Sequence, residues 1–189
     1  RWTCWARMLA ILCTFALVFP PAAVRGDTFA DHFTGANPTW QVKAADKSLR
    51  IVTHRRSDEH GKEGSGEFLA VEVERAAHPL RIEHVLPKAR VLNELEAVVW
   101  VKCSRPGVQI HLRVVLPEYE DAESGRPISF LIPGEALEEV EDWQRLSCRT
   151  DDKLVQERLV LLRAKLNRPL TPKVLQVERV VLTWPLAKG

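Results

Sequence analysis

The chain has 189 residues, 46% of them hydrophobic and 28% charged, with a formal net charge of +2. This length and composition are typical of one globular domain and exclude a disordered or low-complexity protein. The nearly balanced charge also excludes the clustered basic excess of a nucleic-acid-binding protein, so we expect no nucleic-acid partner.

The first 26 residues have the pattern of a secretory signal peptide. Two arginines precede an apolar run from Met8 to Val18, and the small residues Val24 and Gly26 lie before Asp27. This pattern predicts export and cleavage before Asp27. The expected location of the mature protein is therefore extracellular, periplasmic or at the cell surface.

The expected leader also defines the domain boundaries. Ala23 offers an alternative cleavage point, and an uncleaved anchor is a further alternative, but the apolar run is shorter than the roughly 20 residues of a membrane span. The leader holds three arginines and no acidic residue, so its removal leaves a formal charge of −1. We expect a signal peptide over residues 1–26, one domain over residues 27–189, few contacts between the two and no stable membrane span after cleavage. Because the sequence begins with Arg1 rather than Met, we expect a fragment or an incomplete reading frame.

Short segments with alternating apolar and polar residues, separated by polar or proline-containing turns, follow along the rest of the chain. Such alternation is typical of β-strands with one buried face. The segments that show it are 28–33, 40–43, 48–54, 68–75, 80–86, 95–103, 108–116, 128–132, 142–149 and 173–184. Many short strands with polar turns predict an all-β fold, a two-sheet antiparallel β-sandwich.

The segment 95–116 is the clearest pair of strands, because its two arms flank a Ser-Arg-Pro-Gly turn signal. This arrangement predicts an antiparallel hairpin in which one face joins the core and the other forms one continuous patch. The patch is the candidate ligand-binding surface. Its residues are Trp100, Lys102, Gln109, His111 and Arg113. A solvated sheet face, or burial of Trp100 under a helix, is the alternative.

Residues 54–67 are rich in charged residues, histidine and glycine, which is the composition of a solvated surface loop. The spacing of their side chains matches no zinc or calcium pattern, so we expect no metal and no cofactor. The acidic runs 118–121 and 138–142 are neighbours in sequence rather than facing carboxylates. Hydrolase, phosphate-loop and dinucleotide motifs are absent from the sequence, and we expect a protein that is not an enzyme.

One helix is expected, over residues 154–167. Its apolar residues Val155, Leu159, Leu162 and Leu166 recur at spacings of four, three and four, as on one face of a helix. An amphipathic helix on a sandwich needs an apolar sheet surface to cover, and we expect this helix at the periphery.

Cys103 and Cys148 are the cysteines that follow the leader. Both fall on the core face of an expected strand, and exported proteins favour disulfide bonds. We therefore predict a disulfide between them; the alternative is two separate buried thiols that act as small hydrophobic residues.

Four features carry a resemblance to known domains: the opening Phe-Ala-Asp-His-Phe at 29–33, Trp40 soon after it, Asp-Trp-Gln-Arg-Leu at 142–146, and the closing strand 177–182. With the signal peptide, they resemble the galactose-binding-like and carbohydrate-binding-module-like jelly-roll domains. The resemblance implies a jelly roll that binds glycans as an accessory module, often placed before a catalytic domain. The chain departs from the family pattern at Glu178 and Arg179, where paired aspartates are frequent, and in having a single tyrosine.

The leading hypothesis is a non-catalytic exported module that binds a glycan or another surface polymer through the hairpin patch. The alternative is a structural or interaction sandwich that packs against a missing C-terminal domain, catalytic or not, or against a partner protein. Apolar residues close to the end of the chain, Trp184 and Leu186, favour this alternative. A hydrolase ranks last.

Overall fold

The computed structural model describes residues 6–13, 29–33, 35–43, 49–59, 61–62, 64–73, 78–91 and 95–185. These residues form ten strands and one helix. The elements are β1 (Ala6–Cys13), β2 (Trp40–Lys43), β3 (Leu49–Ser57), β4 (Gly66–Val73), β5 (Leu80–Arg90), β6 (Glu96–Lys102), β7 (Gln109–Glu120), β8 (Pro127–Ala136), β9 (Gln144–Arg149), α1 (Asp152–Leu166) and β10 (Gln176–Trp184).

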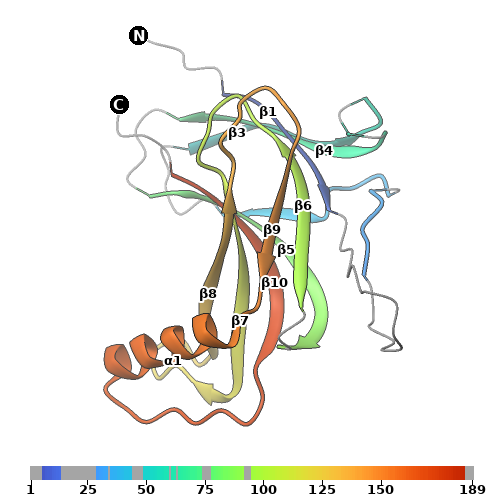
Figure 1. Ribbon diagram of the computed structural model, residues 1–189. Coiled ribbons are helices and arrows are strands. Elements are labelled where there is room, and N and C mark those ends of the chain that lie inside the picture. Colours follow the sequence, from blue (N-terminus) through green and yellow to red (C-terminus); the bar gives the residue numbers. More distant parts are fainter. Residues whose placement is uncertain are drawn as a thin grey trace, which may run out of the picture.

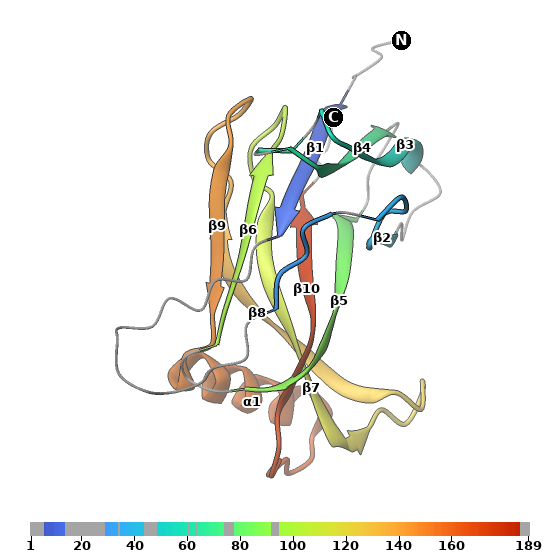
Figure 2. The ribbon, with the colours of Figure 1, turned by 90° about the vertical axis from the view of Figure 1, so that its right-hand side faces the viewer.

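The strands form two five-stranded antiparallel sheets. The first sheet has the order β3-β4-β1-β6-β9 and the second the order β2-β5-β10-β7-β8. The two sheets lie as two layers (Figure 1), and Figure 2 shows them after a quarter turn. The predicted all-β sandwich with one helix is confirmed.

The core lies between the sheets and follows from the alternation in each strand. Val99 and Val101 of β6 point inward from the first sheet, and Ile110 and Leu112 of β7 point inward from the second; all four are fully buried. Fully burying such a side chain stabilises the fold by about 1.5–3 kcal/mol. The two-residue period of these apolar positions therefore fixes which face of each strand is internal.

The predicted hairpin over 95–116 is wrong. Strand β6 pairs with β1 and β9 in the first sheet, whereas β7 pairs with β10 and β8 in the second. The turn between them carries the chain from one sheet to the other. Alternation shows only that each arm has one buried face, and this is true of a hairpin and of a crossing between sheets.

The sheets meet edge to edge where β8 lies against β9. Gly134 permits this contact, because a Cβ atom there would lie 2.4 Å from the carbonyl oxygen of Ser147 and 2.6 Å from Cβ of Cys148. The carboxylate of Glu135 accepts a hydrogen bond of 2.6 Å from the backbone N–H of Ser147. Strand β8 is thus held to both sheets.

Helix α1 lies at one end of the sandwich beside β8 (Figure 1), and Val155 and Leu159 are its buried residues. Asp151 caps its first turn by accepting a hydrogen bond from the N–H of Lys153, and Asn167 ends it in the left-handed conformation. The predicted helix at 154–167 is confirmed with a start two residues earlier. In the described part of the chain, no helix is long and apolar enough to cross a membrane.

Two expectations about the N-terminal region differ from the structure. Strand β1 falls within the expected leader, yet it pairs with β4 and β6, contrary to the expectation of few contacts. The expected cleavage site before Asp27 lies outside the described residues. The sequence predicts a strand at 28–33. The described residues 29–33 are irregular instead, and Ala30 is the one among them that makes an isolated β-bridge.

The predicted disulfide is also wrong, because Cys103 and Cys148 are both free and buried. The register of β6 and β9 places Cys148 opposite Ala97, six residues from Cys103 along the strand. At about 3.3 Å per residue this separates the two thiols by about 20 Å, well beyond bonding reach. The thiol of Cys148 donates instead to the carbonyl oxygen of Ile132.

Candidate functional site

The five residues of the expected hairpin patch do not form one surface. Trp100 and Lys102 alternate with inward residues of β6 and so lie on the outer face of the first sheet, where the Lys62 ammonium sits 3.0 Å from the centre of the Trp100 ring. Helix α1 packs against β8 of the second sheet, so it lies on a different sheet from Trp100. Gln109, His111 and Arg113 lie on the outer face of the second sheet.

The polar groups of these three β7 residues are already engaged within the protein. The Gln109 amide donates to the carbonyl oxygen of Gly134 at 3.0 Å, and the Arg113 guanidinium donates to the Ser129 hydroxyl at 3.2 Å. Nδ1 of His111 lies 3.2 Å from the carbonyl oxygen of Gln109, and burial lowers the pKa of His111, as do the nearby Arg81 and Arg158 guanidinium groups. This face is therefore a satisfied sheet surface rather than a prepared ligand site.

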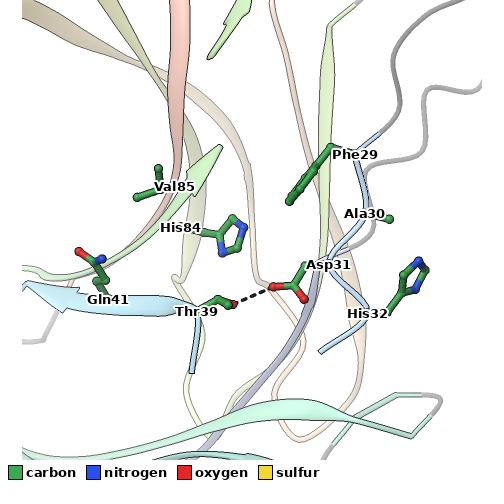
Figure 3. A pocket seen from close by; sticks show the side chains of 8 residues that line it. All are labelled: Phe29, Ala30, Asp31, His32, Thr39, Gln41, His84 and Val85. Carbon is green, nitrogen blue, oxygen red and sulfur yellow. Dashed lines mark hydrogen bonds between the residues drawn. The ribbon is translucent and has the colours of Figure 1, made fainter. Parts of the chain in front are cut away.

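A pocket of about 670 Å³ opens at the edge of the second sheet, where β2 runs beside β5. We call it the β2–β5 pocket. Side chains from an irregular segment and from both strands line it (Figure 3). They belong to Phe29, Ala30, Asp31, His32, Thr39, Gln41, His84 and Val85.

His84 is the buried polar side chain of this pocket, with 4% exposure. Its ring lies 5.2 Å from Trp40 and 6.1 Å from Phe29, measured between ring centres. Both ring nitrogens lack a hydrogen-bond partner among the described residues. Burial lowers the pKa of His84, and the carboxylates of Asp31 and Glu67 oppose this shift without cancelling it.

A buried carboxylate, Glu67, lies behind the pocket with 1% exposure. It accepts hydrogen bonds from the backbone N–H groups of Thr39 and Trp40 and lies 3.2 Å from Nε2 of His54. Burial by itself raises the pKa of Glu67, but the hydrogen bonds from His54, Thr39 and Trp40 together lower it below its usual value. Glu67 is thus held charged inside the sandwich.

Arg56 joins this carboxylate to the pocket wall. Its guanidinium lies 3.5 Å from the carboxylates of both Asp31 and Glu67 and donates to the Thr39 hydroxyl at 3.1 Å. That hydroxyl lies 2.7 Å from the Asp31 carboxylate, the contact drawn in Figure 3, and 2.8 Å from that of Glu67. Asp31 and Thr39 are therefore fixed in position by contacts within the protein.

The sequence places His54, Arg56 and Glu67 in a solvated loop, and this expectation is wrong. Strand β3 continues to Ser57 and β4 begins at Gly66, so these three side chains alternate inward into the sandwich. A strand is predicted from apolar residues at every second position, so a strand with charged residues at its inward positions is not recognised. Residues 29–32 of the opening segment line the pocket, and the ring of Trp40 contacts that of His84.

The described residues contain no group of three His, Cys, Asp or Glu that could hold a metal ion. Comparison of the chain with models of protein families, with curated proteins and with solved structures gave no match.

Proposed function

We propose that this protein is an exported, non-catalytic binding module of the jelly-roll type that holds a glycan or another polyhydroxylated surface polymer in the β2–β5 pocket. One observation carries the proposal. The pocket is a concave site with a fixed polar wall, Asp31 and Thr39, and a buried imidazole, His84, that has no hydrogen-bond partner among the described residues.

The lining supports a sugar-like ligand. Phe29 and Val85 are exposed apolar side chains at the pocket, while Thr39 and Gln41 offer a hydroxyl and an amide. Sugars present apolar C–H faces next to hydroxyl groups, so they match a wall that mixes rings with hydrogen-bonding groups.

The same geometry favours binding over catalysis. Asp31 is held by the Thr39 hydroxyl and the Arg56 guanidinium, and Glu67 is enclosed behind the pocket. His84 lies between aromatic rings and has no carboxylate or hydroxyl within hydrogen-bond reach among the described residues. The usual signature of nucleophilic catalysis is a nucleophile hydrogen-bonded to a base that a third group orients, and His84 has neither partner among the described residues.

A pair of matched variants tests the proposal. Val85→Trp fills the pocket from an exposed position, and Val52→Trp, at a residue of the same 46% exposure on β3, leaves the pocket open. We expect the unaltered chain and Val52→Trp to be retained on immobilised polysaccharides or a glycan array, and Val85→Trp to lose that retention at an unchanged melting temperature. Equal retention of both variants, or no retention of the unaltered chain on any polysaccharide, contradicts the proposal.

A second function, an interaction module, is favoured by a separate observation. Val160 and Leu161 of α1 are 56% and 60% exposed, although they are adjacent apolar residues. A domain or partner protein packed on α1 would cover them. Slower hydrogen exchange of α1 in a longer product of the same reading frame than in this chain supports this function, and equal exchange excludes it.

A further inference from the structure

His84 differs from an ordinary core residue in its position and in its hydrogen bonding. Its side chain is buried, yet it lines the β2–β5 pocket, and its ring points across the pocket toward Asp31 (Figure 3). Most buried polar groups in proteins have a hydrogen-bond partner. His84 has none for either nitrogen among the described residues.

Buried polar atoms without a hydrogen-bond partner are concentrated around the β2–β5 pocket. Seven buried side-chain nitrogen or oxygen atoms of the described residues lack a hydrogen bond, and four of them belong to Trp40, Arg56 and His84. The ring of Trp40 lies against His84, and Arg56 holds the pocket wall through Asp31. Of these four atoms, the two His84 nitrogens belong to a side chain that lines the pocket, and they supply hydrogen-bonding capacity that the protein itself does not use.

We infer that His84 determines the ligand class of the pocket, by exchanging one donated and one accepted hydrogen bond with adjacent hydroxyl groups of an uncharged polyhydroxylated ligand. The inference rests on the proposed function, since it names the ligand chemistry of the same site.

The charged groups near His84 favour an uncharged ligand over an anionic one. Asp31 from the opening segment and Glu67 from β4 are carboxylates, and they repel a carboxylate or phosphate on the ligand. Arg56 from β3 is the cation beside them, but its guanidinium is already shared between those two carboxylates and its side chain is 7% exposed. The residues that line the pocket include no lysine or arginine to pair with an anion, and His32 is the other imidazole among them.

The state of the ring agrees with hydroxyl recognition. Burial lowers the pKa of His84, so the ring is uncharged at neutral pH. An uncharged imidazole has one N–H donor and one acceptor nitrogen, and neighbouring hydroxyl groups of a sugar can accept from the first and donate to the second.

The variant His84→Phe separates a ligand-binding role from a structural one. It keeps the aromatic packing against Trp40 and removes two buried nitrogens that have no partner, so we expect a melting temperature equal to or above that of the unaltered chain. Binding of methyl glycosides of neutral hexoses should weaken by about tenfold or more. His111→Phe is the matched control, because that histidine lies outside the pocket, and it should leave binding unchanged.

The ligand class is measured on the unaltered chain with each methyl glycoside and its uronate counterpart. Preference for the neutral glycoside supports the inference; preference for the uronate overturns it. Undiminished binding by His84→Phe also overturns it, and a lowered melting temperature with intact binding shows that the imidazole is structural. If no glycoside binds, the proposed function fails and the inference is tested separately with ethane-1,2-diol, which has two adjacent hydroxyl groups. A saturable shift of the His84 ring signals in the NMR spectrum, with no shift at His111, supports the inference. The absence of a shift at His84 overturns it.

Discussion

Glu67 is the residue on which the geometry of the pocket wall depends. Its charge is balanced by Arg56 and by donors from Thr39, Trp40 and His54. Breaking a buried pair by removing one charge costs about 3–5 kcal/mol, because the other charge is left unpaired.

We therefore expect Glu67→Gln to lower the free energy of unfolding by about 3 kcal/mol, measured by urea denaturation. Glu72→Gln on the same strand is the control, since Glu72 points outward to a solvent-exposed ion pair with Arg50. Its cost should stay below about 1 kcal/mol. Equal effects of the two substitutions would mean that Glu67 contributes no more than a surface charge.

The lowered pKa of His84 predicts a dependence of stability on pH. The unfolded ring takes up a proton near its usual pKa of 6.5, whereas the folded ring resists protonation to lower pH. As pH falls below about 6.5, the unfolded state therefore binds more protons and stability decreases.

His84→Phe should lose less unfolding free energy than the unaltered chain between about pH 7.5 and about pH 5.5. The lowered pKa of His111 acts in the same direction, but it acts in both proteins and cancels from the comparison. Urea denaturation at the two pH values measures the difference. Identical losses in both proteins would show that His84 has the same pKa folded and unfolded.

At the scale of residues, the sequence predicts little of the site. In the sequence, His84 looks like any other inward residue of an alternating segment. Its neighbours in the fold, Phe29 and Trp40, come from distant parts of the chain and cannot be inferred from that segment. The five residues expected to bind are placed on two different sheets. Side-chain alternation predicts a face but not which strands share it.

Among the elements, α1 gives a direct comparison of buried and exposed packing. Val155 is 4% exposed and Val160 is 56% exposed on the same helix. Val155→Ala should lower the free energy of unfolding by about 2 kcal/mol, because it deletes two buried methyl groups. Val160→Ala should change it by less than about 0.5 kcal/mol. Thermal or urea denaturation of both variants checks this, and a larger cost at Val160 would place the helix with its other face toward the sandwich.

The elements themselves are predicted well where the alternation is apolar, as in β6, β7 and β10, and α1 is predicted within two residues. The predictions fail where charged residues point inward, as Arg56 and Glu67 do. They fail also at the turn between β6 and β7, because hairpins and crossings between sheets use the same turn residues.

At the scale of the whole molecule, the reactivity of the Cys103 and Cys148 thiols tests whether both are buried between the two sheets. Burial raises the pKa of Cys103, and it raises that of Cys148 to about 12. A thiol reacts as the thiolate, so both should resist alkylation in the folded protein and react after denaturation, as mapped by mass spectrometry. Recovery of a peptide pair linked through Cys103 and Cys148 would contradict the register of β6 and β9.

The sandwich as a whole follows from the sequence, because many alternating segments cannot bury their apolar faces except between two sheets. Strand order does not follow from it, since contacts between strands far apart in sequence decide the neighbours. Strand β1 is the clearest case. Its residues have the composition of a leader, and nothing in that composition predicts that they pair with β4 and β6.

The most direct test of the pocket as a binding site is the nitrogen-15 NMR spectrum of the His84 imidazole at neutral pH, with and without a methyl glycoside of a neutral hexose. We predict one protonated and one unprotonated ring nitrogen in the free protein, and a saturable shift of both signals on addition of the glycoside. A doubly protonated ring in the free protein, or binding of the glycoside with both His84 signals unmoved, would contradict this account.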